Sequence, residues 1–156
     1  MSQAEELASQ FEETNAAVVA AIEACDEVAW QNLSEEGWTA AALAHHIAED
    51  HGLIFGLVQG VAMGQPGPGI DMAELDRTNA EHAKNFASCS KAEVVELATT
   101  GADAAATGLR ALTDEQLNNS TDFFGTETTA AQIAQNILIG HAQGHLANFK
   151  AATGQA

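Results

Sequence analysis

Apolar side chains recur at helical spacing along the chain, and no stretch shows the alternation typical of a β-strand. Residues 2–29 predict a first amphipathic helix, because their large apolar side chains gather on one stripe. A second helix is expected to run from Thr39, a good N-cap preceded by Trp38 as a hydrophobic staple, to about Met63. The stripe of the first helix comprises Leu7, Phe11, Val18, Ile22 and Cys25.

The middle of the chain predicts a long connection followed by another long helix. The sequence GQPGPG, residues 64–69, ends the second helix because proline and glycine favour turns. A shorter helix is expected over residues 71–88. Ser90 and Glu93 form a capping-box pattern that starts the next helix, which continues to Leu112. The inner stripe of that helix is rich in small residues, which indicates close approach of a neighbouring helix.

Residues 113–127 are expected to form a polar loop, after which Thr128 or Thr129 caps a last helix that ends near Thr153. The predicted fold is therefore all-α, a four-helix bundle with up, down, down, up topology. The shorter helix lies in the crossover between the second and third long helices. A chain of 156 residues is too short for two ordinary domains, so residues 1–156 are expected to form one.

The last predicted helix carries two histidines on an otherwise apolar row. Ile133, Ile137, His141, His145 and Phe149 follow one another at intervals of four, which aligns them on one helix face. Two imidazoles at this spacing can chelate one metal ion. A complete site needs a further ligand from elsewhere in the chain.

His46 is the expected third ligand. It lies on the buried stripe of the second helix, roughly 12 Å from the start of that helix, whereas His141 and His145 lie roughly 9 to 15 Å from the end of the last helix. These depths coincide because the predicted segments make the two helices antiparallel. Three inward imidazoles leave several buried nitrogens to satisfy, and one divalent ion satisfies them together. The sequence therefore predicts a three-histidine metal site with open positions for water or substrate.

Other polar residues are expected around this site. Asp50, four residues after the second-helix histidine, could support a ligand or act as one. His82 and Asn79 share one face of the crossover helix, and His82 lies at a depth that could line a pocket. Taken alone, such a residue is more often a buried group hydrogen-bonded to a neighbour. His45 and His51 are expected on the flank or surface of the bundle.

The charge balance narrows the range of partners. Five basic and 22 acidic residues give a formal charge of −17, which repels nucleic acid and anionic membranes. No apolar run approaches the ~20 residues that cross a bilayer, and the N-terminus lacks a signal-peptide pattern, so a cytoplasmic protein is expected. Cys25 and Cys89 lack the spacing of a disulfide framework or a thiolate zinc site. A small-molecule substrate is expected, and a homodimer is compatible with the sequence.

Two segments resemble the signature regions of the DinB superfamily, which includes mycothiol- and bacillithiol-dependent transferases and isomerases. They are WTAAALAHHIAEDH, residues 38–51, and HAQGHLANF, residues 141–149. Residues 75–98 are also similar to the family's middle region, with an asparagine in the crossover helix and a serine-capped helix after it. The resemblance implies a four-helix bundle of the predicted topology and a divalent metal held by His46, His141 and His145.

The chain also departs from the family pattern. Leu146, Ala147 and Asn148 replace the Arg-Gly-Gln that often follows the last histidine. His141 stands where the mycothiol-dependent isomerases have a glutamate. Metal binding is therefore a stronger expectation than any particular substrate.

The resemblance implies a metal-dependent transferase or isomerase that uses a low-molecular-weight thiol of the mycothiol or bacillithiol type. The expected cofactor is one divalent ion, zinc or nickel, with iron as a further option. A non-catalytic metal- or ligand-binding bundle is the first alternative, because only Asp50 and His82 are evident proton-transfer groups. A hemerythrin-like iron protein is the second, although it needs two irons and more ligands than the chain is expected to place at one depth.

Overall fold

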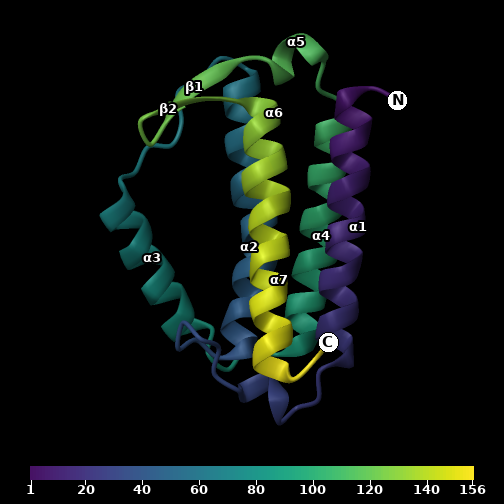
Figure 1. Ribbon diagram of the computed structural model, residues 1–156, viewed down its shortest axis with the longest axis vertical. Coiled ribbons are helices and arrows are strands. Elements are labelled where there is room, and N and C mark those ends of the chain that lie inside the picture. Colours follow the sequence, from purple (N-terminus) through teal and green to yellow (C-terminus); the bar gives the residue numbers. More distant parts are fainter.

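The computed structural model describes residues 1–156, and its long helices form the bundle shown in Figure 1. In Figure 1, α1 and the last helix run in one direction, and α2 and α4 run in the other. The expected up, down, down, up bundle is therefore confirmed. The long helices are α1 (Gln3–Ala24), α2 (Ala40–Ala62), α4 (Lys91–Arg110) and a last helix built from α6 (Ala130–Ile133), η2 (Ala134–Ile139) and α7 (Gly140–Thr153).

The crossover helix α3 (Met72–Asn85) lies beside α2 at an angle to the bundle (Figure 1). The chain that follows α3 is attached to the bundle by two hydrogen bonds. Thr39 Oγ1 donates to the carbonyl of Ala87 at 2.8 Å, and Trp30 Nε1 donates to the carbonyl of Cys89 at 2.8 Å. Because this end is tied down, α3 can stand away from α2 towards its own N-terminus.

The helix boundaries follow local capping chemistry. Ser90 and Glu93 form the expected capping box at the start of α4, and Thr129 caps the last helix in the same way with Gln132. The first helix, however, ends at Ala24 rather than at residue 29. The Asp26 carboxylate accepts a hydrogen bond from the N–H of Ala29 at 2.7 Å, which starts a separate 3₁₀ turn, η1 (Ala29–Gln31).

The expectation of a plain polar loop over residues 113–127, without strands, is wrong. This stretch contains a one-turn helix, α5 (Asp114–Leu117), and an antiparallel hairpin of β1 (Ser120–Phe123) and β2 (Thr126–Thr129). Its threonines are β-branched and favour extended backbone. The Thr121 hydroxyl accepts a hydrogen bond from the N–H of Gly67 at 3.1 Å, so the hairpin is held against the loop that follows α2.

Small residues let α4 approach α2 closely, as the sequence predicts. A Cβ atom added at Gly108 would overlap the ring of Phe55, and one added at Gly101 would lie 3.4 Å from Cβ of His51. His51 is only 1% exposed, and its Nε2 lies 2.7 Å from Oδ1 of Asn15 on α1. The prediction that His51 lies on the flank or surface is therefore wrong. The close approach of α4 to α2 buries the His51 side chain.

A polar layer crosses the bundle between two apolar clusters. It includes the His51–Asn15 pair and a contact of 3.3 Å between Nε2 of Gln143 and Oγ1 of Thr14. The cluster nearer the hairpin includes Phe11, Val58, Leu109 and Ile133, and the cluster nearer the C-terminus includes Ile22, Trp30, Leu43 and Phe149.

None of the helices combines the length and the apolar character of a membrane-spanning segment.

Candidate metal centre

Three histidine side chains from α2 and α7 meet midway along the bundle. Nε2 of His141 lies 3.2 Å from Nε2 of His46 and 3.0 Å from Nε2 of His145. Two nitrogens that each bind one ion at about 2.1 Å lie no more than about 4.2 Å apart. The observed spacings therefore fit one metal ion, and the three residues form a group that could hold it.

These histidines are neutral bases with lone pairs. Burial, together with the smaller effects of the neighbouring His141 and His145, lowers the pKa of His46 to about 3. Burial also lowers the pKa of His141 to about 4, and it lowers the pKa of His145. A neutral imidazole nitrogen either donates or accepts, so three Nε2 atoms that face one another cannot all be satisfied among themselves. A cation at their meeting point would satisfy all three.

Local structure orients each ligand. Thr39 caps α2 by accepting a hydrogen bond from the N–H of Ala42 at 3.1 Å, and Trp38 packs edge-on against the ring of His46 at a centroid distance of 5.3 Å. The last helix is not regular, because η2 is a π-helical segment. This segment changes the helical period between Ile133 and His141, so the predicted row of five is interrupted before the histidines. His141 and His145 both follow it in α7, so they keep their spacing of one turn.

Asp50 adjoins the three nitrogens. Its Oδ2 lies 3.3 Å from Nε2 of His46 and 3.5 Å from Nε2 of His141. Burial, together with the smaller effect of the nearby Glu49, raises the pKa of Asp50 to about 7. In the absence of an ion, Asp50 therefore exchanges its proton near neutral pH, where the histidines are neutral. A divalent cation beside Asp50 would favour its ionised form.

A second polar cluster lies next to the first, between α2 and α3. The Nδ1 atom of His82 lies 2.7 Å from Oε2 of Glu49, and its Nε2 atom lies 3.1 Å from Nδ1 of His45. Because a carboxylate only accepts, His82 donates to Glu49 through Nδ1. The direction of the hydrogen bond between His82 and His45 depends on the tautomers of the two rings. The ring of Phe86 stacks on His45 at a centroid distance of 3.7 Å. His45 faces the flank of the bundle, as expected, but it is buried there because α3 and Phe86 cover it.

A cavity of about 470 Å³ opens from His46, Asp50 and His141. Thr78 and Asn79 on α3 contribute polar groups to its wall, whereas His82 lies behind His46 and is not part of the wall, with 5.6 Å between the two ring centroids. Most of the remaining wall is apolar and includes Leu53, Ile54, Leu57, Leu75, Ile137 and Phe123. The predicted pocket residues Asp50 and Asn79 therefore face the same space.

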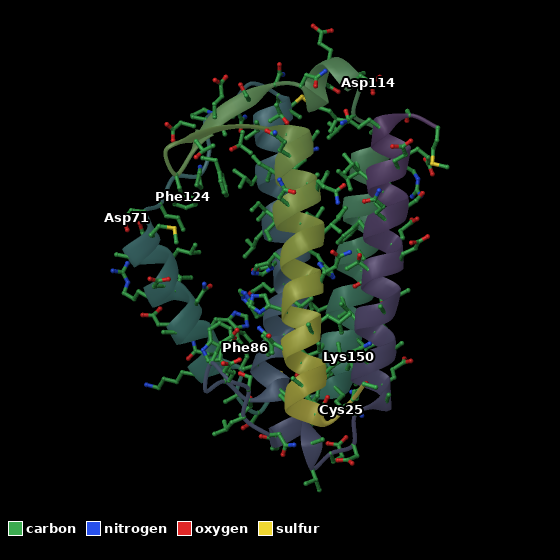
Figure 2. All side chains as sticks on the ribbon, viewed as in Figure 1. Cys25, Asp71, Phe86, Asp114, Phe124 and Lys150 are labelled. Carbon is green, nitrogen blue, oxygen red and sulfur yellow. The ribbon has the colours of Figure 1, made fainter.

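The turn of the hairpin closes the far side of this cavity. Phe124 lines it and occupies the first position of the two-residue turn with φ +50°, followed by Gly125 with φ +89°. Such a turn favours asparagine or glycine at the first position, and positive φ costs other L-residues roughly 1–2 kcal/mol. Figure 2 shows Phe124 beneath the hairpin, near the Asp71 end of α3.

Sequence reasoning missed two parts of the site. Glu49 follows His45 by four residues, so the spacing could have revealed the pair. The alternating threonines around Phe123 and Gly125 could have indicated a hairpin. Neither signal indicates where these groups lie in space.

Comparison with known families and structures agrees with this geometry. Residues 10–148 match the DinB superfamily. No functionally curated protein matches the chain by sequence. The solved structure described as "YfiT from Bacillus subtilis is a probable metal-dependent hydrolase with an unusual four-helix bundle topology" superposes with a TM-score of 0.77 at 17% identity, over 100% of this chain and 91% of that one.

The mycothiol-dependent maleylpyruvate isomerase is also similar in structure. It superposes with a TM-score of 0.76 at 13% identity over 94% of this chain, and a mutant of that isomerase gives 0.75 at 14% identity. This chain spans 60% of the length of the isomerase structures. At these identities the likeness concerns the fold.

Proposed function

The chain belongs to the DinB superfamily, and we propose that it is a divalent-metal-dependent enzyme that uses a low-molecular-weight thiol for transfer or isomerisation. The observation that carries the proposal is the convergence of three neutral Nε2 atoms beside a cavity. His46, His141 and His145 would hold the ion. A site with three protein ligands keeps positions open, as catalytic metal sites do. A divalent ion bound there lowers the pKa of a thiol or water and so supplies a nucleophile near neutral pH.

The surrounding residues provide binding and orientation. Oδ2 of Asp50 lies close to both His46 and His141, so it can accept a hydrogen bond from a thiol or water beside them, or act as a further ligand. The hydroxyl of Thr78 and the amide of Asn79 face the same cavity and can orient a substrate. The apolar wall excludes water, which protects a reactive thiolate.

The comparisons support each half of this proposal separately. YfiT is described as a probable metal-dependent hydrolase, and the isomerase is described as mycothiol-dependent. Imidazole ligands suit zinc or nickel, and iron is a further option. We therefore expect one ion of this group per chain, with a mycothiol- or bacillithiol-type cosubstrate and a second small molecule as acceptor.

A non-catalytic metal- or ligand-binding bundle is the competing proposal. It is favoured by the absence of lysine, arginine or cysteine from the cavity wall. A hemerythrin-like iron pair is less well supported. The second cluster also brings one ligand atom each from His45, Glu49 and His82 within 4.8 Å of one another. His82, however, contacts Glu49 through one ring nitrogen and His45 through the other, so its nitrogens already have partners.

Metal analysis followed by a thiol-conjugation assay tests the proposal. The purified protein is loaded with zinc or nickel and its metal content is measured per chain. It is then assayed with mycothiol, bacillithiol or glutathione and the electrophile chlorodinitrobenzene. We expect one ion per chain and turnover that His141→Ala abolishes. Failure to bind stoichiometric metal contradicts the metal site. Full metal occupancy without turnover in a broader screen favours the non-catalytic alternative.

A further inference from the structure

The cavity beside the candidate metal centre has an unusual combination of charge and wall chemistry. None of the 5 lysine and arginine residues of the chain lines it. Arg77 lies on α3 close in sequence to the wall residues Thr78 and Asn79, but its side chain is 67% exposed and pairs with Glu74 at 3.9 Å. The one carboxyl group in the wall is that of Asp50. In the metal-free protein an anionic ligand would therefore lose water and meet no side chain of opposite charge.

The apolar part of the wall continues to the rim. Leu53 is 65% exposed, Phe124 is 40% exposed and Ile70 is 37% exposed, and all three line the cavity. Large apolar side chains left open to solvent around one hollow indicate a binding surface. The rim and the wall therefore both favour an apolar ligand.

Phe124 supplies an independent observation. Its backbone has φ +50°, a conformation that disfavours phenylalanine, and yet its ring is not buried in the core. Packing in the core therefore does not offset this strain. The conformation places two aromatic rings at the cavity, because Phe123 lies edge-on to Phe124 at a centroid distance of 4.9 Å.

We infer that the cavity binds an uncharged, largely apolar small molecule, which packs against Phe123 and Phe124 with its polar end towards Asn79 and the His46–His141 side. Where this molecule is the acceptor substrate, the inference rests on the proposed thiol chemistry. The binding preference itself follows from the cavity wall. A carboxylate substrate would need a cation that this wall lacks.

A matched pair of ligands tests the charge preference. Binding of methyl cinnamate and of cinnamate to the metal-stripped protein is measured by calorimetry, so that no bound cation attracts the carboxylate. The two molecules share an aromatic ring and differ in charge. We expect the ester to bind at least about tenfold more tightly, a difference of about 1.4 kcal/mol. Equal or tighter binding of cinnamate overturns the inference.

The same titration of zinc-loaded protein separates this inference from the proposed function. The ester should still bind, because the apolar wall is unchanged. A protein that fails to bind zinc but prefers the ester contradicts only the proposed function. A protein that binds zinc but not the ester contradicts only the inference made here.

Two substitutions test the wall itself. Phe124→Asn suits the positive φ, so the unfolding midpoint should stay the same or rise, while affinity for the ester should fall about five- to tenfold. Val28→Asn is the matched control, because Val28 is 81% exposed and lies outside the cavity wall. Leu53→Lys should increase affinity for cinnamate. Unchanged ester binding in Phe124→Asn, or unchanged cinnamate binding in Leu53→Lys, contradicts the inference.

Discussion

Adjacent histidines on α2 belong to two polar clusters that satisfy their nitrogens in different ways. His46 points its Nε2 at the Nε2 atoms of α7, so that three ring nitrogens meet at one place and cannot all be paired with one another. His45 instead belongs to a chain with His82 and Glu49 in which donors and acceptors alternate. A cation would satisfy the first cluster, whereas the contacts of the second already pair both ring nitrogens of His82.

The difference arises from the neighbouring helix rather than from the residue type. Both clusters contain histidine and a nearby acidic residue, and both start from consecutive positions of α2. α7 presents two histidines one turn apart, whose Nε2 atoms face the same point. α3 presents His82 alone, and its ring lies between an acid and another imidazole. Two neighbouring groups can therefore both bring their ligand atoms within 4.8 Å of one another and still differ in how their nitrogens are paired.

The largest expected effect comes from adding metal to the stripped protein. At an ion concentration about 1,000 times the dissociation constant, binding should stabilise the wild type by about 4 kcal/mol. Thermal or chemical unfolding with and without zinc measures this. His141→Ala should lose the stabilisation, and His82→Ala, the same change in the other cluster, should keep it. Equal loss in both variants would show that the clusters act as one.

Acid should destabilise the metal-free protein through its buried histidines. His51 is the simplest case, because it pairs only with Asn15 and burial lowers its pKa from 6.5 to about 4. Its unfolded form therefore binds a proton that the folded form rejects. The associated stability is complete above about pH 6.5 and is lost as the pH falls towards 4, up to about 3 kcal/mol.

His51→Gln isolates this contribution, because glutamine can still pair with Asn15 and does not titrate. The free energy of unfolding is measured by chemical unfolding between pH 4 and 7. Its slope against pH should correspond to roughly one fewer proton taken up on unfolding than in the wild type. An unchanged slope would show that folding does not lower the pKa of His51.

Asp50→Asn should weaken zinc binding without abolishing it. Groups that support metal ligands typically contribute a factor of about 10–100 in affinity, and Oδ2 of Asp50 lies within 3.5 Å of two ligand nitrogens. Competition with a chelator of known affinity measures the change. A loss as large as that of His141→Ala would instead identify Asp50 as a ligand.

The smallest effect is expected from Glu49→Gln. Glutamine can still accept from His82 but removes the charge, so stability should fall by about 1 kcal/mol and zinc affinity should hardly change. Urea unfolding and the chelator competition measure the two quantities. A clear loss of zinc affinity would mean that the hydrogen-bonded chain supports the metal centre, and the contrast between the two clusters would then be weaker.

Much of the fold follows from local sequence. Ser90 with Glu93 and Thr129 with Gln132 set helix starts within one turn, and those starts are observed. The predictions are wrong where a side chain hydrogen-bonds to the backbone in place of the helix, and where a strand needs a distant partner. Asp26 ends α1 early by capping the next turn, and the hairpin forms only because β1 finds β2 and Gly67 as partners.

The candidate site divides in the same way. The sequence by itself determined that His141 and His145 share a face and that His46 lies at their depth, because helical rise and periodicity are properties of each segment. Only the tertiary structure decided that α3 covers His45, that α4 covers His51, and that Phe124 closes a cavity beside the three nitrogens. These outcomes depend on contacts between segments far apart in the chain, such as those of Trp30 with Cys89 and Thr39 with Ala87, and no local pattern encodes them.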